Sequence, residues 1–253
     1  MMVKRSAAFG SPITMSDPNL DRIADQLDSP NSRDRLLGLT ALRDVPAVDA
    51  VPLIKKVLND DHLQVRTMAV FALGLKPTEE CFDLLLDLLA DGDYSVRANA
   101  AGALGYLHDL RAVEPLIQLF YEDADWLVRF SAAVSLGNLG DPRARKTLID
   151  ALDSPEVIVQ QAAIAALGEV GAIEAIEKML TFVKSDDWLV RQRLAESLGK
   201  LPTDKSRSAL RYLAKDGHPQ VVDAANHGLQ QLDLLAQSAD AADDSESLPG
   251  PIE

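Results

Sequence analysis

The feature that most constrains the fold of this sequence is an internal repeat of about 31 residues. "DGDYSVRANAAGALGYLHD", residues 91–109, and "DADWLVRFSAAVSLGNLGD", residues 123–141, share acids, an aromatic residue, Val-Arg, alanines, Leu-Gly and a closing Asp in the same order. Alignment on the Arg gives seven anchors at steps of 31 or 32 residues: Arg35, Arg66, Arg97, Arg129, Gln160, Arg191 and Val222. A fixed period of this length predicts stacked copies of one small unit, which form a solenoid.

Glycine forms a second landmark of the repeat. It lies eight residues after each of the five inner anchors, at Gly74, Gly105, Gly137, Gly168 and Gly199. The first and last copies carry Arg43 and Gln230 at this position. Terminal copies have one neighbour and one face in water, so deviating ends are expected of caps.

Each copy reads as two helices. Apolar residues in "TEECFDLLLDLLA" recur with helical spacing from Cys81, and Thr78 is a suitable N-cap. Asp93 and Asp125 are expected to cap the second helices, and the glycine after each Leu is expected to end them in a left-handed conformation. Alanines at one repeat position are expected to let neighbouring helices pack closely: Ala100, Ala132, Ala163 and Ala225. The predicted fold is an all-α, right-handed α-solenoid of about seven two-helix repeats.

Composition bounds the class of protein. The 253 residues carry a formal charge of −14, which argues against binding to nucleic acid because phosphate contacts need clustered Lys and Arg. A single cysteine, Cys81, fits a reducing compartment, and no apolar run is long enough to span a membrane, so a cytoplasmic location is expected. We predict a flexible segment at 1–18, the solenoid at 19–235 and a disordered acidic tail at 236–253.

The repeated segments resemble the HEAT-repeat subclass named after phycobilisome lyases, and the likeness covers about residues 19–235. The resemblance implies HEAT-like helix pairs whose second helices line a concave surface. It also implies a structural ladder of an Asp before each second helix and an Arg within it. The matching residues are Asp60 with Arg66, Asp91 with Arg97 and Asp123 with Arg129, joined by Arg191, while Ser154 with Gln160 interrupts the ladder.

Three longer segments are similar to a cyanobacterial family of HEAT-repeat proteins that interact with IscA-type iron–sulfur proteins. These segments are "LDSPNSRDRLLGLTALRD", "VPLIKKVLNDDHLQVRTMAVFALG" and "DWLVRQRLAESLGKLP". This resemblance implies an assembly factor whose partner is an IscA-type protein, or a phycobiliprotein or another photosynthetic assembly partner.

Candidate chemistry is sparse in the sequence. Deoxyhypusine hydroxylases need His-Glu dipeptides, and none of the four histidines is followed by Glu. His62 and His218 share one repeat position five copies apart, which favours capping or exposure over metal binding. Cys81 lies in an apolar helical stripe, which favours core packing over ligation of an iron–sulfur cluster. We therefore predict no catalytic residue, metal or cofactor. A bilin lyase or lyase-like chaperone acting on phycobiliproteins remains the alternative function.

Aromatic residues recur three positions before the anchor, at Tyr94, Trp126 and Trp188. Apolar side chains follow at helical spacing in two copies, and polar ones replace them after Trp188. Trp and Tyr are favoured anchors at protein interfaces, so this stripe is predicted to bind a partner, although each Trp could instead pack beneath the next repeat as core. The predicted partner-binding residues are Phe71, Tyr94, Trp126, Phe130, Trp188 and Gln192. The sequence thus favours a non-catalytic scaffold or adaptor.

Overall fold

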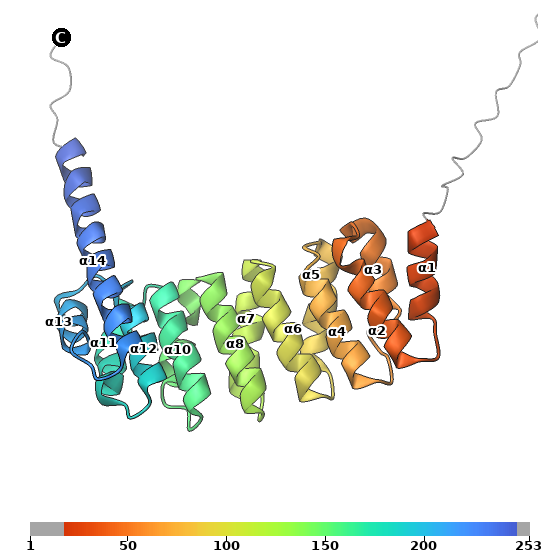
Figure 1. Ribbon diagram of the computed structural model, residues 1–253, viewed down its shortest axis with the longest axis horizontal. Coiled ribbons are helices and arrows are strands. Elements are labelled where there is room, and N and C mark those ends of the chain that lie inside the picture. The colour runs from red at the N-terminus through yellow and green to blue at the C-terminus, as the bar shows by residue number, and fades with distance from the viewer. Residues whose placement is uncertain (1–17, 247–253) are drawn as a thin grey trace, which may run out of the picture. The chain divides into compact units, whose positions relative to one another are not determined.

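The computed structural model describes residues 18–246, and every regular element in this range is a helix (Figure 1). The all-α class predicted from the sequence is confirmed. The predicted flexible segment 1–18 lies outside the described residues except for Pro18, which begins the first helix. No helix in residues 18–246 combines the length and the apolar character needed to cross a bilayer.

The described residues form seven consecutive pairs of α-helices, as the repeat count predicted. Their bounds are α1 Pro18–Leu27, α2 Ser32–Ala41, α3 Ala47–Lys55, α4 Leu63–Gly74, α5 Glu79–Asp87, α6 Tyr94–Tyr106, α7 Val113–Glu122, α8 Trp126–Leu139, α9 Arg145–Ala151, α10 Val157–Glu169, α11 Ile176–Met179, α12 Trp188–Leu198, α13 Asp204–Leu213 and α14 Pro219–Glu246. Short 3₁₀ turns flank them: η1 Leu42–Asp44, η2 Leu88–Ala90, η3 Leu110–Ala112, η4 Pro142–Ala144, η5 Ile173–Ala175 and η6 Leu180–Lys184.

Contacts between the described residues divide the chain into two compact units, one that ends at Ala72 and one that begins at Leu73. Helix α4 begins in the first unit, and its last two residues, Leu73 and Gly74, belong to the second. In the first unit α1 packs against α2 and α3. One uninterrupted solenoid over residues 19–235, and its right-handed turn, stay predictions.

In the second unit the second helices of the pairs pack in sequence, from α6 through α8, α10 and α12 to α14 (Figure 1). Helices α5, α7, α9 and α13 each pack against the second helix of their own pair, and η6 packs against α12. The unit therefore has a layer of second helices and a layer of first helices. The alanines predicted at the helix contacts are fully buried.

Side-chain caps determine where the helices begin. The Thr78 hydroxyl accepts a hydrogen bond from the backbone N–H of Cys81 at 3.2 Å, and Asp93 and Asp125 accept from the N–H groups two residues later. These contacts satisfy donors that the first turn of a helix leaves without a partner. The three N-caps predicted from the sequence are thereby confirmed.

The glycines after each Leu have a different role from the one predicted. The five glycines eight residues after the anchors do not adopt the left-handed conformation, which occurs among the described residues at His108, at Gly140 directly after Leu139, and at Gly171. A Cβ atom added to Gly105 would lie 2.6 Å from Ser135 Oγ and 2.9 Å from Ser135 Cα. All five repeat glycines make such an approach to the next second helix, at Gly74–Ala103, Gly105–Ser135, Gly137–Ala166, Gly168–Ser197 and Gly199–Gly228. The missing side chain thus sets the distance between neighbouring helices.

The last helix also differs from the prediction. Helix α14 continues through Glu246, whereas the sequence predicted a disordered tail from residue 236. Between 236 and 242 four of the seven residues are alanine, the residue with the highest helix propensity, which supports continuation of the helix despite the acidic charge. The rest of the predicted tail, 247–253, lies outside the described residues.

Candidate protein-binding surface

Three aromatic side chains occupy equivalent positions on the layer of second helices. Tyr94, Trp126 and Trp188 are the first residues of α6, α8 and α12, directly after the capping aspartates Asp93, Asp125 and Asp187. Because each cap fixes the start of its helix, the repeat places the aromatic ring in the first turn every time. Their exposed fractions are 47%, 45% and 36%. All three rings are therefore accessible to a partner.

In α10 an aliphatic residue occupies the position that the aromatic residues hold in α6, α8 and α12. Val157 is the first residue of α10 and is 46% exposed, and the adjacent Ile158 is 40% exposed. The aromatic pattern in the sequence does not include Val157 or Ile158. Val157 nevertheless stands three residues before its anchor, as the aromatic residues do. We call Tyr94, Trp126, Val157 and Trp188 the helix-start row. It runs across four second helices that pack in sequence.

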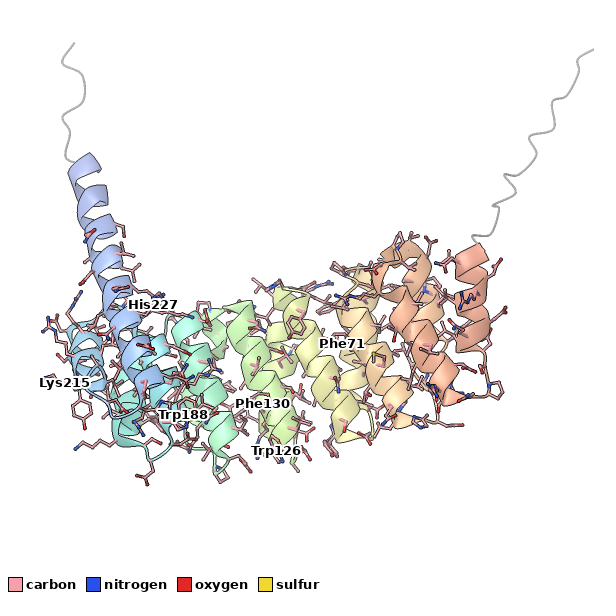
Figure 2. All side chains as sticks on the ribbon, viewed as in Figure 1. Phe71, Trp126, Phe130, Trp188, Lys215 and His227 are labelled. Atoms are coloured by element: carbon pink, nitrogen blue, oxygen red, sulfur yellow. The ribbon has the colours of Figure 1, made fainter. Side chains whose placement is uncertain are left out.

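Two further predicted residues lie one turn beyond this row. Phe130 follows Trp126 along α8 and is half-buried (Figure 2). Gln192 follows Trp188 along α12 and donates a hydrogen bond to Glu196 Oε1 at 2.8 Å. The apolar character of the surface therefore continues along α8 and becomes polar along α12.

Trp188 combines the two roles weighed for the tryptophans. Its ring stacks on that of His218 from the next copy, with centroids 4.1 Å apart and an interplanar angle of 11°. His218 thus covers one face of the indole, although Trp188 as a whole is 36% exposed. The pairing also places His218 against an aromatic ring rather than beside metal ligands. In the part of the chain that the structure describes, no cluster of three or more His, Cys, Asp or Glu could hold a metal ion.

Phe71 lies on α4 within the first unit and is 51% exposed. The other predicted partner-binding residues lie in the second unit, and Phe71 is not a member of the helix-start row. The role of all six as a partner-binding surface stays a prediction.

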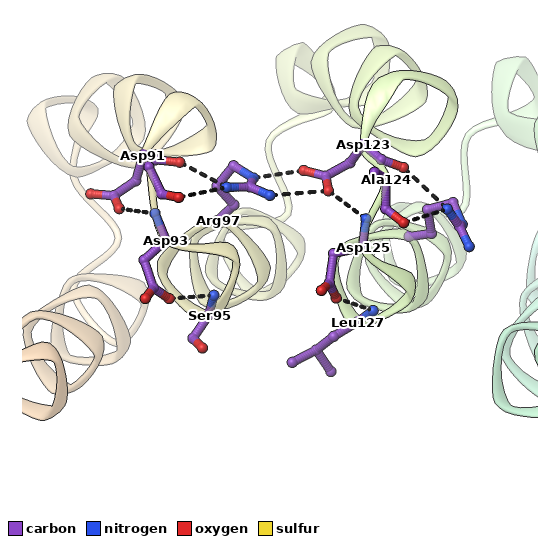
Figure 3. Close-up of polar contacts among 10 residues, drawn as sticks. Asp91, Asp93, Ser95, Arg97, Asp123, Ala124, Asp125 and Leu127 are labelled. Atoms are coloured by element: carbon purple, nitrogen blue, oxygen red, sulfur yellow. Dashed lines mark hydrogen bonds and ion pairs between the residues drawn. The ribbon is translucent and has the colours of Figure 1, made fainter.

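Four arginine anchors, Arg35, Arg97, Arg129 and Arg191, each contact both the loop of their own copy and an acid of the next copy, as Figure 3 shows for Arg97. Arg97 on α6 donates through Nη1 to the backbone oxygen of Asp91 at 2.9 Å. Through Nε and Nη2 it donates to both carboxylate oxygens of Asp123, at 2.6 and 3.1 Å. Asp123 also accepts from the N–H of Asp125, which holds the loop before α8. Two parallel bonds to one carboxylate are the strong geometry for a guanidinium.

These contacts define which atoms join the residues of the ladder. Asp91 and Asp123 do not use their carboxylates to bind the arginines of their own copies, Arg97 and Arg129; those arginines bind the backbone oxygens of these residues. The carboxylate partner comes from the following copy. The same offset recurs at Arg35–Asp60, Arg129–Glu156 and Arg191–Asp216. Arg66 likewise binds the backbone oxygen of Asp60, at 2.7 Å.

The predicted interruption at Gln160 is visible in its contacts. Gln160 Nε2 donates to the backbone oxygen of Ser154 at 2.7 Å, so the link to its own loop persists. The link to the next copy comes from the adjacent Gln161, which donates to Asp187 Oδ2 at 3.1 Å. A neutral amide thus replaces the charged fork between these copies.

Burial and pairing shift the pKa values of the ladder residues in opposite directions, and pairing has the larger effect. Burial raises the pKa of Asp123, but the bonds from Arg97 and from the Asp125 N–H outweigh it and hold this pKa below its usual 3.8. The bond from Arg191 likewise lowers the pKa of Asp216. The bond to Asp123 raises the pKa of Arg97. These carboxylates are therefore ionised at neutral pH.

Cys81 lies in the core, as its place in the apolar stripe of α5 predicted. The side chain is fully buried, and this burial raises the pKa of the thiol. The Thr78 hydroxyl lies 3.1 Å from Cys81 Sγ. A buried thiol with a raised pKa is a weak nucleophile and a weak metal ligand.

Comparison with known proteins agrees with this repeat geometry. A sequence profile of HEAT repeats matches residues 82–168 and 145–230, which together span more than half of the chain. The chain belongs to the HEAT-repeat family. No curated protein matches this HEAT-repeat sequence.

Two solved structures are similar to this HEAT-repeat protein in fold. The complex of CpcE and CpcF of phycocyanin lyase from Nostoc sp. PCC7120 matches with a TM-score of 0.57 and 19% identity, over 90% of this chain and 100% of that chain. An engineered protein matches with a TM-score of 0.56 and 20% identity, over 85% of this chain and 68% of that chain. At these identities the likeness concerns the fold alone.

Proposed function

We propose that this HEAT-repeat protein is a non-catalytic scaffold or assembly factor that binds another protein through its layer of second helices. The observation that carries this proposal is the helix-start row, in which four consecutive second helices each present an accessible aromatic or aliphatic side chain at the same position. Scattered apolar residues are normal on protein surfaces, but a contiguous apolar row is typical of an interaction site.

The chemistry of the row suits a protein partner. Trp and Tyr offer large apolar area with few rotatable bonds, which is why they dominate the energetics of many interfaces. Trp126 is one of the two inner members of the row, and Phe130 lies one turn beyond it on α8. An anchor near the centre of an interface is best shielded from water. We expect Trp126 to contribute most to the affinity.

The partner follows from the sequence resemblance. We propose an IscA-type iron–sulfur protein as the partner, with binding in the cytoplasm during the assembly of iron–sulfur or photosynthetic complexes. A partner of this kind would bring its own cluster, so this role requires no ligand set in the HEAT-repeat chain.

The test is a binding titration of the full chain with a purified IscA-type protein. Trp126→Ala should weaken binding by about 2 kcal/mol, a loss of about 30-fold, without changing helical content by circular dichroism. Tyr212→Ala is the matched control, because Tyr212 is 54% exposed but lies on the first helix α13. Equal binding by all three proteins would contradict the proposed surface.

The alternative is a bilin lyase or lyase-like chaperone acting on phycobiliproteins, and the fold shared with a phycocyanin lyase complex favours it. Incubation of the full chain with phycocyanobilin and apo-phycocyanin distinguishes the two functions. Covalent attachment of the bilin would establish the lyase. Stable co-elution with apo-phycocyanin and no attachment would support a chaperone or adaptor.

A further inference from the structure

A second candidate surface lies on the layer of first helices. A groove of about 650 Å³ opens between α5 with η2 and the neighbouring first helix α7. It is lined by Leu86, Leu89, Ala90, Glu114, Pro115, Ile117, Gln118, Leu119 and Glu122. This volume falls within the range of about 300–1,000 Å³ that is usual for binding sites.

The groove arises from the different packing of the two layers. Gly105 on α6 and Ser135 on α8 bring the second helices of these pairs into close contact. The first helices instead face each other with large side chains, including Leu86, Ile117 and Leu119, and these remain half-buried. A partner that covered these side chains would remove their apolar area from water.

The segments that flank the groove are strongly acidic. Residues 79–90 and 113–122 contain six acidic residues and no Lys or Arg. Near the start of these helices Glu79 pairs with Arg111 and Glu114 pairs with Arg143. Each of these arginines also pairs with a second carboxylate, Asp109 or Asp141, so the negative charge there is only partly compensated.

Further acids lie later on the same helices. Asp83 and Asp87 are exposed on α5, and Glu122 on α7 accepts hydrogen bonds from the neutral amide of Gln118. The groove therefore has an apolar floor with Glu114 and Glu122 in its lining, and the exposed Asp83 and Asp87 lie on α5 close in sequence to the lining residue Leu86.

We propose that this groove binds an amphipathic helix of a partner protein that carries Lys or Arg beside a stripe of Leu or Phe. The apolar stripe packs on Leu86, Leu89 and Ile117, and the basic residues lie against Asp87 and Glu122. A helix laid into an apolar groove is a recurrent mode of peptide recognition, with anchors at i, i+3, i+4 and i+7. The acidic side chains attract a basic helix and repel an acidic one. Because the helix-start row lies on the other layer, the chain can hold two partners at once.

The test uses the full chain and three synthetic helical peptides, followed by fluorescence anisotropy. The first peptide has a Leu/Phe stripe with flanking Lys, the second has the same stripe with Glu in place of Lys, and the third keeps the Lys but scrambles the stripe. Only the first should bind, and its affinity should fall as salt rises, because salt screens the acidic side chains. Binding of the second or third peptide as tight as that of the first would overturn the proposal.

Substitutions in the protein test whether the peptide binds in the groove. Asp87→Asn with Glu122→Gln should weaken binding of the first peptide by about tenfold and reduce its salt dependence. These changes are at the surface, so the fold is retained. Asp21→Asn with Asp25→Asn on α1 changes the net charge equally and should leave binding unchanged. Equal effects of the two pairs would show that the peptide senses only net charge, which would overturn the site.

Two further measurements distinguish this proposal from other occupants of the groove and from the proposed function. Trp126→Ala should leave binding of the first peptide unchanged, so failure of the helix-start row would not imply failure of the groove. A synthetic peptide of residues 1–17, which contains Lys4 and Arg5, is added as a competitor. If it displaces the first peptide at equal concentration, the groove's occupant is a segment of this chain or of a second copy, and the partner assignment is wrong.

Discussion

Two joints between neighbouring second helices share their buried contacts. Between α6 and α8, Gly105 meets Ser135, whose hydroxyl donates to the backbone oxygen of Ala101 at 2.8 Å. Between α10 and α12, Gly168 meets Ser197 in the same way. The Ser197 hydroxyl donates to the backbone oxygen of Ile164, also at 2.8 Å.

The same joints differ at their edge. Arg97 reaches Asp123 with two charge-assisted bonds at the first joint. At the second joint the link is one bond from the neutral amide of Gln161 to the carboxylate of Asp187. Since both pairs of helices pack closely, the buried glycine–serine contact is sufficient to define the joint. The ladder then adjusts how strongly each joint is held.

The largest effect is expected from filling the shared contact. Gly105→Val would place side-chain atoms where Ser135 already lies, and overpacking of this kind should lower the free energy of unfolding by about 3 kcal/mol. Gly168→Val should cost a similar amount, because a Cβ there lies 2.9 Å from Ser197 Cα. Urea unfolding followed by circular dichroism measures both.

The control for this pair is Gly102→Ala on α6. A Cβ at Gly102 meets no atom within 4 Å, so alanine should stabilise the helix by about 0.5–1 kcal/mol through its higher propensity. If Gly168→Val were harmless while Gly105→Val unfolded the chain, the two joints would not share one contact and the comparison would fail.

A smaller loss is expected at the ladder. Arg97→Ala leaves the Asp123 carboxylate, whose side chain is 7% exposed, without its guanidinium, and should cost about 2 kcal/mol. Arg97→Lys should recover little, because an ammonium cannot make the two parallel bonds. Gln161→Ala removes the single bond to Asp187 across the second joint and should cost about 1 kcal/mol. Equal losses at the two positions would refute the assigned difference between the joints.

Acid pH should reduce the difference between the wild-type chain and Arg97→Ala. The folded-state pKa of Asp123 lies below its usual 3.8, so its pairing contributes stability that is fully present above about pH 4. This contribution is lost as the pH falls through the lower folded-state pKa. The unfolding free energies of the two proteins should therefore converge in acid, whereas the gap between wild type and Gln160→Ala should stay constant.

Local and periodic features of this fold could be predicted from the sequence. The 31-residue period indicated the helix pairs, and Asp93 and Asp125 marked where second helices begin, because capping depends only on the residues of one turn. The ladder partners could not be assigned in this way. Arg97 lies six residues after Asp91 and 26 before Asp123, and only the stacking of the copies shows that the second carboxylate is the one bound.

The role of the glycines and parts of the surface could not be predicted either. A glycine near a helix end fits a left-handed cap and a close helix contact equally well, and Ser135 decides for the contact at Gly105. Val157 is aliphatic, so a pattern of aromatic residues does not predict it. The groove depends on the spacing of α5 and α7, which no single copy encodes.

The smallest expected effect comes from restoring the ladder at the weaker joint. Ser185 occupies the position of Asp123 in its copy, and Gln160 that of Arg97. Gln160→Arg combined with Ser185→Asp would supply a guanidinium that still reaches the backbone oxygen of Ser154 and a carboxylate in the next copy. Because such a pair lies at the edge of the joint and is partly solvated, the expected gain is only about 0.5 kcal/mol. Amide hydrogen exchange is the more sensitive measurement: exchange in α10 and α12 should be faster than in α6 and α8 in the wild-type chain and should slow in the double variant. Each single variant should fail to slow it, since an added charge without its partner gains nothing. If exchange at the two joints is equal in the wild-type chain, the charged fork makes no difference to how firmly neighbouring copies are held.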